Sequence, residues 1–384
     1  MEIFFIGNYP HDRQESMERF TQMLNSGFRT AGYKSQIWRP KVIFGRYFKF
    51  TNRGIGKWMG YIDKWIIFPM VLHWRVQYRL HSRTDIRFHV CDHSNAPYLK
   101  YLPSDRTCIT CHDVIAIRGG VGFADTFNKA SNLGEYLQKW ILNNLKKAKK
   151  IAFVSQFTLD QLKELVSYQE TDQQEWTVIY NGFNADFRPI RVNVRNALLL
   201  KVGLNPDIPY LLHVGSEMAR KNRKLLLEMV SALGNKWEGS ICYAGEALDD
   251  ALKIRVAELG LQDRVVSIVN PNHEILVALY SACDAFIFPS LAEGFGWPLI
   301  EAQACGAPVI ASNLEPMLEV SGGTALHADP NNPQEFADVF LSLKEKSIRA
   351  DLILKGYRNC LRFELSPIIN SYLVLHGLER VHLN

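Results

Sequence analysis

The sequence lacks any long run of apolar residues. The best candidate for a membrane span, residues 65–72, is too short to cross a bilayer and contains Pro69. The first residues, Met-Glu-Ile-Phe-Phe-Ile-Gly, carry neither a basic region nor a cleavage pattern, so we expect no secretory signal. Together these absences predict a folded cytoplasmic protein rather than a secreted or membrane-spanning one.

Cysteines are few, and metal-binding patterns are scarce. Seven scattered cysteines in 384 residues are typical of a reduced protein without a disulfide framework. Cys108 and Cys111 form a C-x-x-C pair, but positions three apart on a strand point to opposite faces, and no second pair exists. No Asp-x-Asp pattern stands near the expected site either. We therefore expect no metal and no redox role.

Acidic residues are almost missing from residues 34–83. Eleven Lys or Arg stand there against the single acid Asp63, and aromatic residues are interleaved with them. One interpretation is a helix that packs on its own sheet and exposes basic residues to water. The other is an element that binds an anionic membrane surface. Nucleic acid is disfavoured because no nucleic-acid-binding motif accompanies the charge.

The overall pattern predicts an α/β protein. Hydrophobic residues make up 47% and charged residues 22% of 384 residues, enough for two or perhaps three domains. Short apolar strands alternate with helical segments in both halves, which is typical of parallel sheets. Residues 57–80 read as a helix kinked at Pro69. We place the domain boundary within 186–206, a stretch punctuated by prolines.

The most informative stretch is residues 284–312. A buried strand at 285–288 precedes a glycine loop, then a helix, then a second strand at 307–311. Pro298 stands where a first helical residue is favoured, and Gly306 stands where the helix should stop. The N–H groups near Pro298 and Leu299 are expected to face a diphosphate.

Two carboxylates frame this loop and helix. Glu293 lies in the loop and Glu301 lies eight positions later, one turn into the helix. A carboxylate only accepts hydrogen bonds and therefore suits the hydroxyls of a sugar or a ribose. An isolated pair of Glu residues would more often be two solvated side chains, but the Pro-Ser, Gly-Phe-Gly and Cys-Gly-Ala-Pro-Val context favours binding.

This stretch resembles the Glu-x7-Glu region of retaining glycosyltransferases of family GT4. The resemblance implies the GT-B fold, two Rossmann-like α/β domains with parallel sheets facing across a cleft. It also implies that Glu293 and the backbone of Gly294, Phe295 and Gly296 orient the donor sugar, and that Glu301 holds the ribose. Pro298 and Leu299 would then contribute to binding the donor diphosphate.

Weaker matches extend the resemblance through the second half. The segment from Gly215 and Ser216 to Arg220 and Lys221 is similar to the family's pyrophosphate clamp. Some members have Arg at the place of Ser216, so the clamp here would depend more on Lys221. Gly245 begins the loop that often contacts the nucleotide, and the base is expected near residues 246 and 270–275.

The first half matches less completely. His112, with Asp113 after it, resembles the His-Asp whose His approaches the donor sugar, and His93 is a second candidate. Relatives often have two glycines after the first strand, whereas this chain offers only Gly7. The expected domains are residues 1–188 with a C-terminal crossover helix at 366–384, and residues 206–365.

The resemblance implies transfer of a sugar from a UDP- or GDP-linked donor to an acceptor hydroxyl, with retained configuration. The expected acceptor is a glycan or a lipid-linked sugar in polysaccharide or glycolipid assembly, and neither cofactor nor nucleic acid is expected. We expect a cytoplasmic enzyme and leave open its attachment to the inner face of the membrane. The alternatives are an epimerase or phosphorylase on the same fold, and a catalytically silent sugar-binding protein.

Overall fold

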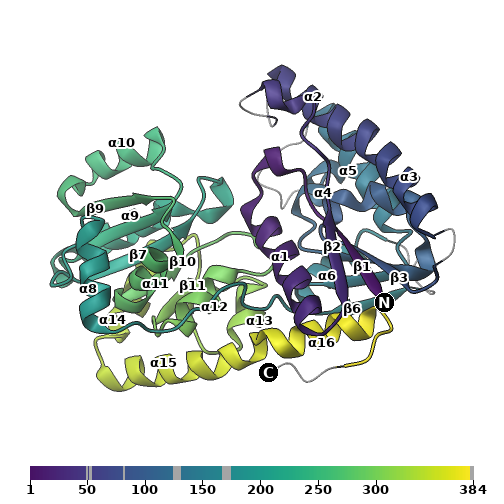
Figure 1. The fold of residues 1–384 in the computed structure, drawn as a ribbon. Helices are drawn as coiled ribbons and strands as arrows, with labels where there is room; N and C mark the ends of the chain where they lie inside the picture. Colours follow the sequence, from purple (N-terminus) through teal and green to yellow (C-terminus); the bar gives the residue numbers. More distant parts are fainter. Residues whose placement is uncertain (49–50, 52–53, 81–82, 124–130, 167–173, 381–384) are drawn as a thin grey trace. The chain divides into compact units, whose positions relative to one another are not determined.

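The structure is a computed structural model that describes residues 1–48, 51, 54–80, 83–123, 131–166 and 174–380. The chain forms two compact units (Figure 1). Unit 1 comprises Met1–Asn184 and Leu365–Asn384, and unit 2 comprises Ala185–Glu364.

Unit 1 is built on a six-stranded parallel sheet in the order β2-β1-β3-β4-β5-β6. β1 and β4 are buried along their whole length, as strands covered by helices on both faces must be. The strands are β1 (Glu2–Ile6), β2 (Lys34–Trp38), β3 (Ile86–Val90), β4 (Thr107–Cys111), β5 (Lys150–Phe153) and β6 (Glu175–Val178). The helices are α1 (Glu15–Thr30), α2 (Gly54–Ile62), α3 (Phe68–Leu80), α4 (Ile115–Val121), α5 (Asn132–Leu145), α6 (Gln156–Lys163) and α16 (Leu365–Leu375).

Unit 2 repeats this architecture with the strand order β12-β11-β10-β7-β8-β9. Its strands are β7 (Tyr210–Gly215), β8 (Ser240–Gly245), β9 (Val265–Val269), β10 (Ala285–Phe288), β11 (Val309–Ser312) and β12 (Leu326–Ala328). Its helices are α8 (Val192–Lys201), α9 (Arg223–Leu233), α10 (Asp250–Glu258), α11 (His273–Ala282), α12 (Trp297–Ala304), α13 (Met317–Ser321), α14 (Pro333–Ser342) and α15 (Lys346–Cys360).

Three local expectations differ from the structure. The stretch expected as a linker contains helix α8, which packs on α11 and buries Leu199, so this stretch belongs to unit 2. Residues 178–180 are predicted from their apolar pattern to form the last strand of unit 1, whereas this strand lies at Glu175–Val178. The helix at the C-terminus ends at Leu375, and residues 381–384 lie outside the described residues.

The helix expected at 57–80 is interrupted before Pro69 rather than kinked at it. A π-helical segment, Asp63–Ile67, joins α2 to α3. Pro69 has no N–H for the carbonyl four residues earlier, and the turn before it is widened. The hydroxyl of Tyr98 donates to the carbonyl oxygen of Lys64 in this turn at 3.0 Å. Among the described helices, none is both long enough and apolar enough to cross a membrane.

Candidate active site

Two loops of unit 2 meet where its strand order reverses. β7 lies between β8 and β10, and the chain runs outward through β8 and β9 before returning to β10 on the other side. Residues 216–222 follow the carboxyl end of β7, and residues 289–296 follow that of β10. Open α/β sheets bind their ligands at such a point, because neighbouring loops diverge there and leave a crevice.

Glu293 lies between two cations at this point. Its Oε1 accepts a hydrogen bond from Lys221 Nζ at 2.6 Å, and its Oε2 accepts one from Arg220 Nη1 at 2.7 Å. Arg220 Nη1 also donates to the carbonyl of Ala292 at 2.8 Å. Glu293 is only 7% exposed, so this is an ion triad largely shielded from water. The structure thus brings Glu293, expected to bind the sugar, together with Arg220 and Lys221, expected to bind the diphosphate.

The backbone holds the two loops against each other. Leu291 N–H donates to the carbonyl of Arg220 at 2.7 Å. Asn222 adopts the left-handed conformation with φ 51°, and its amide donates to the carbonyls of Pro289 and Pro330 at 3.1 and 2.8 Å. Asn tolerates this conformation better than most residues. Asn222 therefore ends the short turn that carries Arg220 and Lys221 and fixes it to the loop of Glu293.

The electrostatics favour the ionised carboxylate. Burial by itself would raise the pKa of Glu293, but the charges and hydrogen bonds of Lys221 and Arg220 outweigh it and lower the pKa to about 2. Burial lowers the pKa of Lys221, and the charge of Glu293 opposes this effect. Because Glu293 is buried and its two partners are half-buried, loss of one partner would leave charge on Glu293 less compensated in a poorly solvated place.

Helix α12 begins at a glycine that the geometry requires. Gly296 has φ 101°, and a Cβ there would lie 3.2 Å from the ring of Phe288. The side chain of Phe295 is buried against Phe363, so it stabilises the loop rather than facing a ligand. The backbone groups at the start of α12 differ from the prediction that N–H groups near Pro298 and Leu299 face a diphosphate. Pro298 has no N–H, and the N–H of Leu299 donates to the carbonyl of Gly296 at 3.0 Å.

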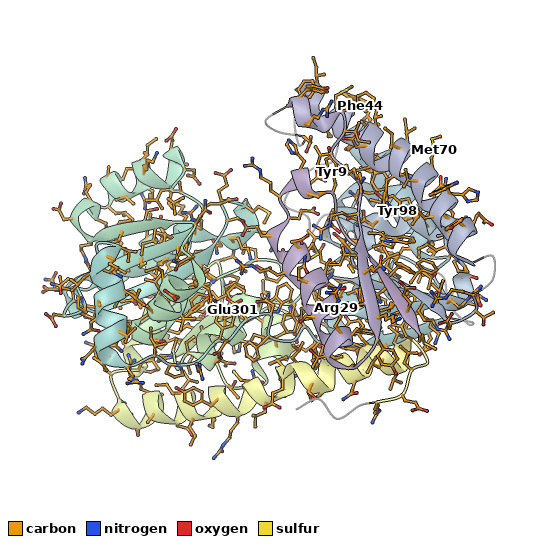
Figure 2. The ribbon with its side chains drawn as sticks, viewed as in Figure 1. Tyr9, Arg29, Phe44, Met70, Tyr98 and Glu301 are labelled. Atoms are coloured by element: carbon orange, nitrogen blue, oxygen red, sulfur yellow. The ribbon has the colours of Figure 1, made fainter. Side chains whose placement is uncertain are left out.

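Glu301 has a partner of its own. The hydroxyl of Tyr280 donates to its Oε2 at 3.0 Å, and both side chains are buried (Figure 2 labels Glu301). Tyr280 belongs to α11, where the sequence pattern predicts only an apolar helix face. Sequence reasoning therefore missed it, because nothing local distinguishes a core tyrosine from one that positions a carboxylate.

The loops after β7 and β8 are held close together. Gly245 has φ 122°, and a Cβ on it would lie 2.4 Å from the carbonyl oxygen of Gly215. The carboxylate of Glu246 accepts from the N–H of Glu217 at 2.6 Å. The close approach and the positive φ explain why glycine is needed at position 245.

Three buried polar atoms near the carboxyl ends of β7 and β10 have no hydrogen-bond partner among the described residues: His213 Nε2, Ser216 Oγ and Ser290 Oγ. His213 lies on β7, where its Nδ1 is 3.2 Å from the carbonyl oxygen of Ile287, and burial lowers its pKa to about 3. A neutral ring that donates through Nδ1 has an accepting lone pair at Nε2. The sequence did not single out His213, since it stands inside an apolar strand.

In unit 1 the residues predicted to contribute to the site follow strands β1, β3 and β4; they are Gly7, His93 and His112. The N–H of Gly7 donates to the carbonyl of Trp38 at 2.8 Å, so this group is engaged in the sheet instead of facing a phosphate. His112 Nε2 lies 2.9 Å from the carbonyl of Cys91 and must therefore carry the proton. Burial lowers the pKa of His112, opposed by the charge of Asp92. A neutral ring has its accepting lone pair on Nδ1.

Asp92 organises the polar groups around His112. It accepts from the N–H of Ser94 at 2.8 Å and from the amide of Asn8, and its Oδ1 lies 3.3 Å from Nδ1 of His93. Burial would raise the pKa of Asp92, but His93, His112 and these hydrogen bonds lower it. His93 also lies near the backbone N–H of His112, at 3.4 Å. His93, the second histidine candidate, therefore contacts the backbone of His112, the first candidate.

Each cysteine of the C-x-x-C pair contacts a neighbouring polar group of unit 1. Cys108 is 3.5 Å from Nδ1 of the buried His376, and Cys111 donates to the carbonyl of Asp113. Within the described parts of the chain, no three His, Cys, Asp or Glu side chains come together as metal ligands would.

Comparison with known proteins gives two kinds of match. Residues 195–358 match the family model described as glycosyl transferases group 1. An O-antigen chain mannosyltransferase B from Escherichia coli is 28% identical over 250 residues, which are 62% of this chain and 64% of that protein. The chain thus spans less than two thirds of the length of this curated relative.

Solved structures match the whole fold. Sucrose-phosphate synthase from Thermosynechococcus elongatus has a TM-score of 0.73 at 18% identity, covering 98% of both chains. HepE from Anabaena, in complex with UDP and glucose, also has a TM-score of 0.73, at 16% identity, covering 98% of this chain and all of that one. These similarities confirm the GT-B fold predicted from the sequence.

Proposed function

We propose, from the match of residues 195–358 to the family model of group 1 glycosyltransferases, that the protein transfers a sugar from a UDP- or GDP-linked donor to an acceptor hydroxyl, retaining its anomeric configuration. The observation that carries the proposal is the ion triad of Glu293, Arg220 and Lys221 at the switch point of the second sheet. Such a site has a carboxylate that can accept hydrogen bonds from sugar hydroxyls and two cations that can bind a diphosphate.

The triad serves as a resting state that the donor reorganises. The single charge of Glu293 compensates part of the charge of Arg220 and Lys221. A bound diphosphate carries more charge than a carboxylate, so it takes over the two cations and releases Glu293 toward the sugar hydroxyls. As the bond to the leaving group breaks, Arg220 and Lys221 stabilise the growing charge on the diphosphate. This neutralisation does not depend on a metal.

Glu301 holds the nucleoside end. Its carboxylate can accept from the two hydroxyls of a ribose, and the hydrogen bond from Tyr280 fixes its orientation. Ser216, in the loop after β7, has an unpaired hydroxyl near the same strand ends. The donor is thereby held at the ribose, at the diphosphate and at the sugar.

Retention is proposed to follow from attack on the face that the leaving group departs from. The acceptor oxygen forms the bond to the anomeric carbon, the bond from that carbon to the phosphate oxygen breaks, and the acceptor proton passes to the phosphate. The products are the glycoside and the nucleoside diphosphate. His112 would accept a hydrogen bond from the donor sugar through its unprotonated Nδ1. Glu293 as a covalent nucleophile is the competing route.

The acceptor is proposed to be a growing glycan or a lipid-linked sugar. The name of the mannosyltransferase relative, which acts on an O-antigen chain, supports a glycan acceptor, and the HepE complex supports UDP as one nucleotide to test. A lipid-linked acceptor would bring the enzyme to the cytoplasmic face of a membrane.

Thermal unfolding with UDP, GDP and ADP tests the donor site. A ligand at about 100 times its Kd adds roughly 2.7 kcal/mol to the unfolding free energy, which is readily seen. We expect one nucleotide to raise the midpoint in the wild type and to lose this effect in Glu301→Ala. Donor sugars of that nucleotide are then assayed for release of nucleoside diphosphate with and without glycan acceptors.

Stabilisation by none of the three nucleotides, together with no release from their sugar donors, would contradict the proposal. Exchange of the donor sugar's configuration without transfer would indicate an epimerase instead. A product with inverted configuration would leave transfer intact and contradict the proposed attack geometry.

A further inference from the structure

Helix α3 of unit 1 and the π-helical segment before it expose a row of large apolar side chains. Ile66, Met70, Trp74 and Tyr78 recur every fourth residue and are 56%, 69%, 67% and 73% exposed. Residues four apart lie above one another on one helix face. The rings of Trp74 and Tyr78 stack with centroids 5.8 Å apart. Figure 2 shows Met70 on the outer side of α3, away from Tyr98 in the interior.

The opposite side of α3 packs in the hydrophobic core of unit 1. Phe68, Leu72 and Val76 form a second row at the same spacing and are buried. In the π-helical turn, Trp65 packs on Tyr98 and on Trp140 of α5. The outer row is therefore not needed to hold the helices in place, and an exposed apolar surface of this size requires another explanation.

The turn before these helices adds apolar side chains to the same region. The backbone N–H groups of Ile43, Phe44 and Gly45 donate to the carboxylate of Asp63 at 3.0, 3.1 and 3.0 Å. Tyr9 OH donates to the same carboxylate at 2.7 Å. Asp63 thus ties the turn to the π-helical segment, and the turn exposes Ile43, Phe44 and Tyr47 (Figure 2 labels Phe44 beside α2).

Within the described residues of 34–83 the exposed charges have one sign, although Lys64 of the π-helical segment pairs with Asp12 at 2.7 Å. Lys41, Arg46, Lys57 and Arg75 lie among the apolar side chains, with Arg46 over the ring of Tyr47 at 4.7 Å and Arg75 over that of Trp38 at 5.2 Å. The one acid of residues 34–83 is Asp63, which is buried and compensated by four hydrogen bonds. Lys49, Phe50 and Arg53, part of the predicted basic–aromatic stretch, lie outside the described residues.

We propose that this surface, residues 43–47 with the outer face of α2 and α3, inserts its apolar side chains into the interface of a lipid bilayer that carries anionic headgroups. Trp, Tyr and Met would enter the boundary between headgroups and acyl chains, while the basic residues remain at the phosphates. The surface is part of unit 1 alone, and the inference does not depend on the transfer chemistry of unit 2.

The choice of a bilayer over a protein partner rests on charge and composition. A second copy of the chain would bring the same cations against these cations, which is unfavourable. Tryptophan and tyrosine suit a membrane boundary because each has an apolar ring and one polar group. A flat row of such residues, with basic neighbours and no exposed acid among the described residues of 34–83, matches an anionic lipid surface.

Co-sedimentation of the full chain with vesicles tests the inference. Vesicles of phosphatidylcholine, with or without phosphatidylglycerol, are compared for the wild type and for the combined variant Met70→Ser, Trp74→Ser and Tyr78→Ser. We expect the wild type to bind the anionic vesicles and each removed large side chain to weaken binding by about tenfold. The matched control is Tyr136→Ser, since Tyr136 is 71% exposed on α5 of the same unit and should leave binding unchanged.

A second arm separates charge from apolar insertion. Arg46→Glu with Lys57→Glu should reduce binding to phosphatidylglycerol vesicles and leave binding to phosphatidylcholine unchanged. Wild-type binding should also fall between about 0.1 M and about 1 M salt, as the screening length shortens from about 10 Å to about 3 Å. Thermal unfolding checks that the variants are folded.

Two results would overturn the proposal. One is a folded triple variant that binds anionic vesicles as tightly as the wild type. The other is a wild type that does not bind these vesicles at about 0.1 M salt. If such a non-binding wild type is a dimer in sedimentation velocity and the triple variant is a monomer, a second copy covers this surface instead.

Discussion

Lys221 Nζ lies 2.6 Å from Oε1 of Glu293, and the two residues are 72 positions apart in the chain. The contact exists because β7 and β10 are neighbours in the sheet, although β8 and β9 lie between them in the sequence. A carboxylate expected to bind a sugar and a cation expected to bind a diphosphate are therefore bound to each other in this structure. Under the proposed function, binding of the donor exchanges these partners.

The exchange predicts opposite effects of Glu293→Gln on binding and on transfer. The amide keeps the size of the side chain but removes its charge, so Arg220 and Lys221 no longer need to leave a carboxylate. We expect the Kd of the nucleoside diphosphate to stay equal or fall, while the rate of transfer falls by several orders of magnitude. Calorimetric titration and a transfer assay measure the two quantities. If nucleotide binding is lost in a folded variant, the assigned role is wrong.

The same substitution predicts a pH dependence of stability. The pKa of Glu293 is lowered to about 2 in the folded protein, so the ion triad stabilises the fold above the unfolded-state pKa of about 4.5, and this contribution is lost as pH falls toward 2. The shift corresponds to about 3 kcal/mol. We expect the difference in unfolding free energy between the wild type and Glu293→Gln to shrink as pH falls through this window.

Denaturant unfolding at several pH values between about 6 and about 2 measures that difference. Glu258→Gln is a suitable control, because this exposed carboxylate on α10 pairs with Arg255 at the surface. A difference between wild type and Glu293→Gln that stays constant over the whole range would show that the carboxylate is not held ionised by the two cations.

Tyr280→Phe tests whether the hydroxyl positions Glu301. Hydrogen bonds to charged groups contribute roughly 1.5–3 kcal/mol, so we expect the affinity for the nucleoside diphosphate to fall by about tenfold or more. Discrimination between the ribose and the 2′-deoxyribose form should narrow as well. Tyr210→Phe is the matched control, since its buried hydroxyl donates to the backbone carbonyl of Leu279 rather than to a carboxylate. Equal effects of the two substitutions would indicate a general loss of stability.

How much of the structure the sequence predicts depends on whether each interaction joins residues that are near or distant in the chain. The GT-B fold was predictable from alternating strands and helices and from the resemblance carried by Glu293 and Glu301. The start of α12 at Gly296 was also predictable from the local sequence, because the glycine that allows the required backbone conformation and the proline that favours a helix start lie close together in the chain. Helix α8 was missed since the prolines around it were taken as signs of a linker, whereas packing on α11 stabilises the helix.

The partners inside the site were not predictable in this way. Local reasoning expected the N–H groups near Pro298 and Leu299 to face a diphosphate, but the N–H of Leu299 closes the turn from Gly296. The pairings of Glu293 with Lys221 and of Glu301 with Tyr280 each join distant elements. Only the strand order and helix packing bring these side chains together.

Asn222 offers the sharpest test of how the cations are positioned. Its left-handed backbone and its two hydrogen bonds, to Pro289 and Pro330, are separable by substitution. Asn222→Gly keeps the backbone conformation accessible and loses the hydrogen bonds, while Asn222→Ala loses both. We expect transfer to fall in both variants and unfolding free energy to fall by about 1 kcal/mol more in Asn222→Ala, owing to the strained backbone. If Asn222→Gly transfers sugar at the wild-type rate, the amide does not hold Arg220 and Lys221 in place, and the conformation alone suffices.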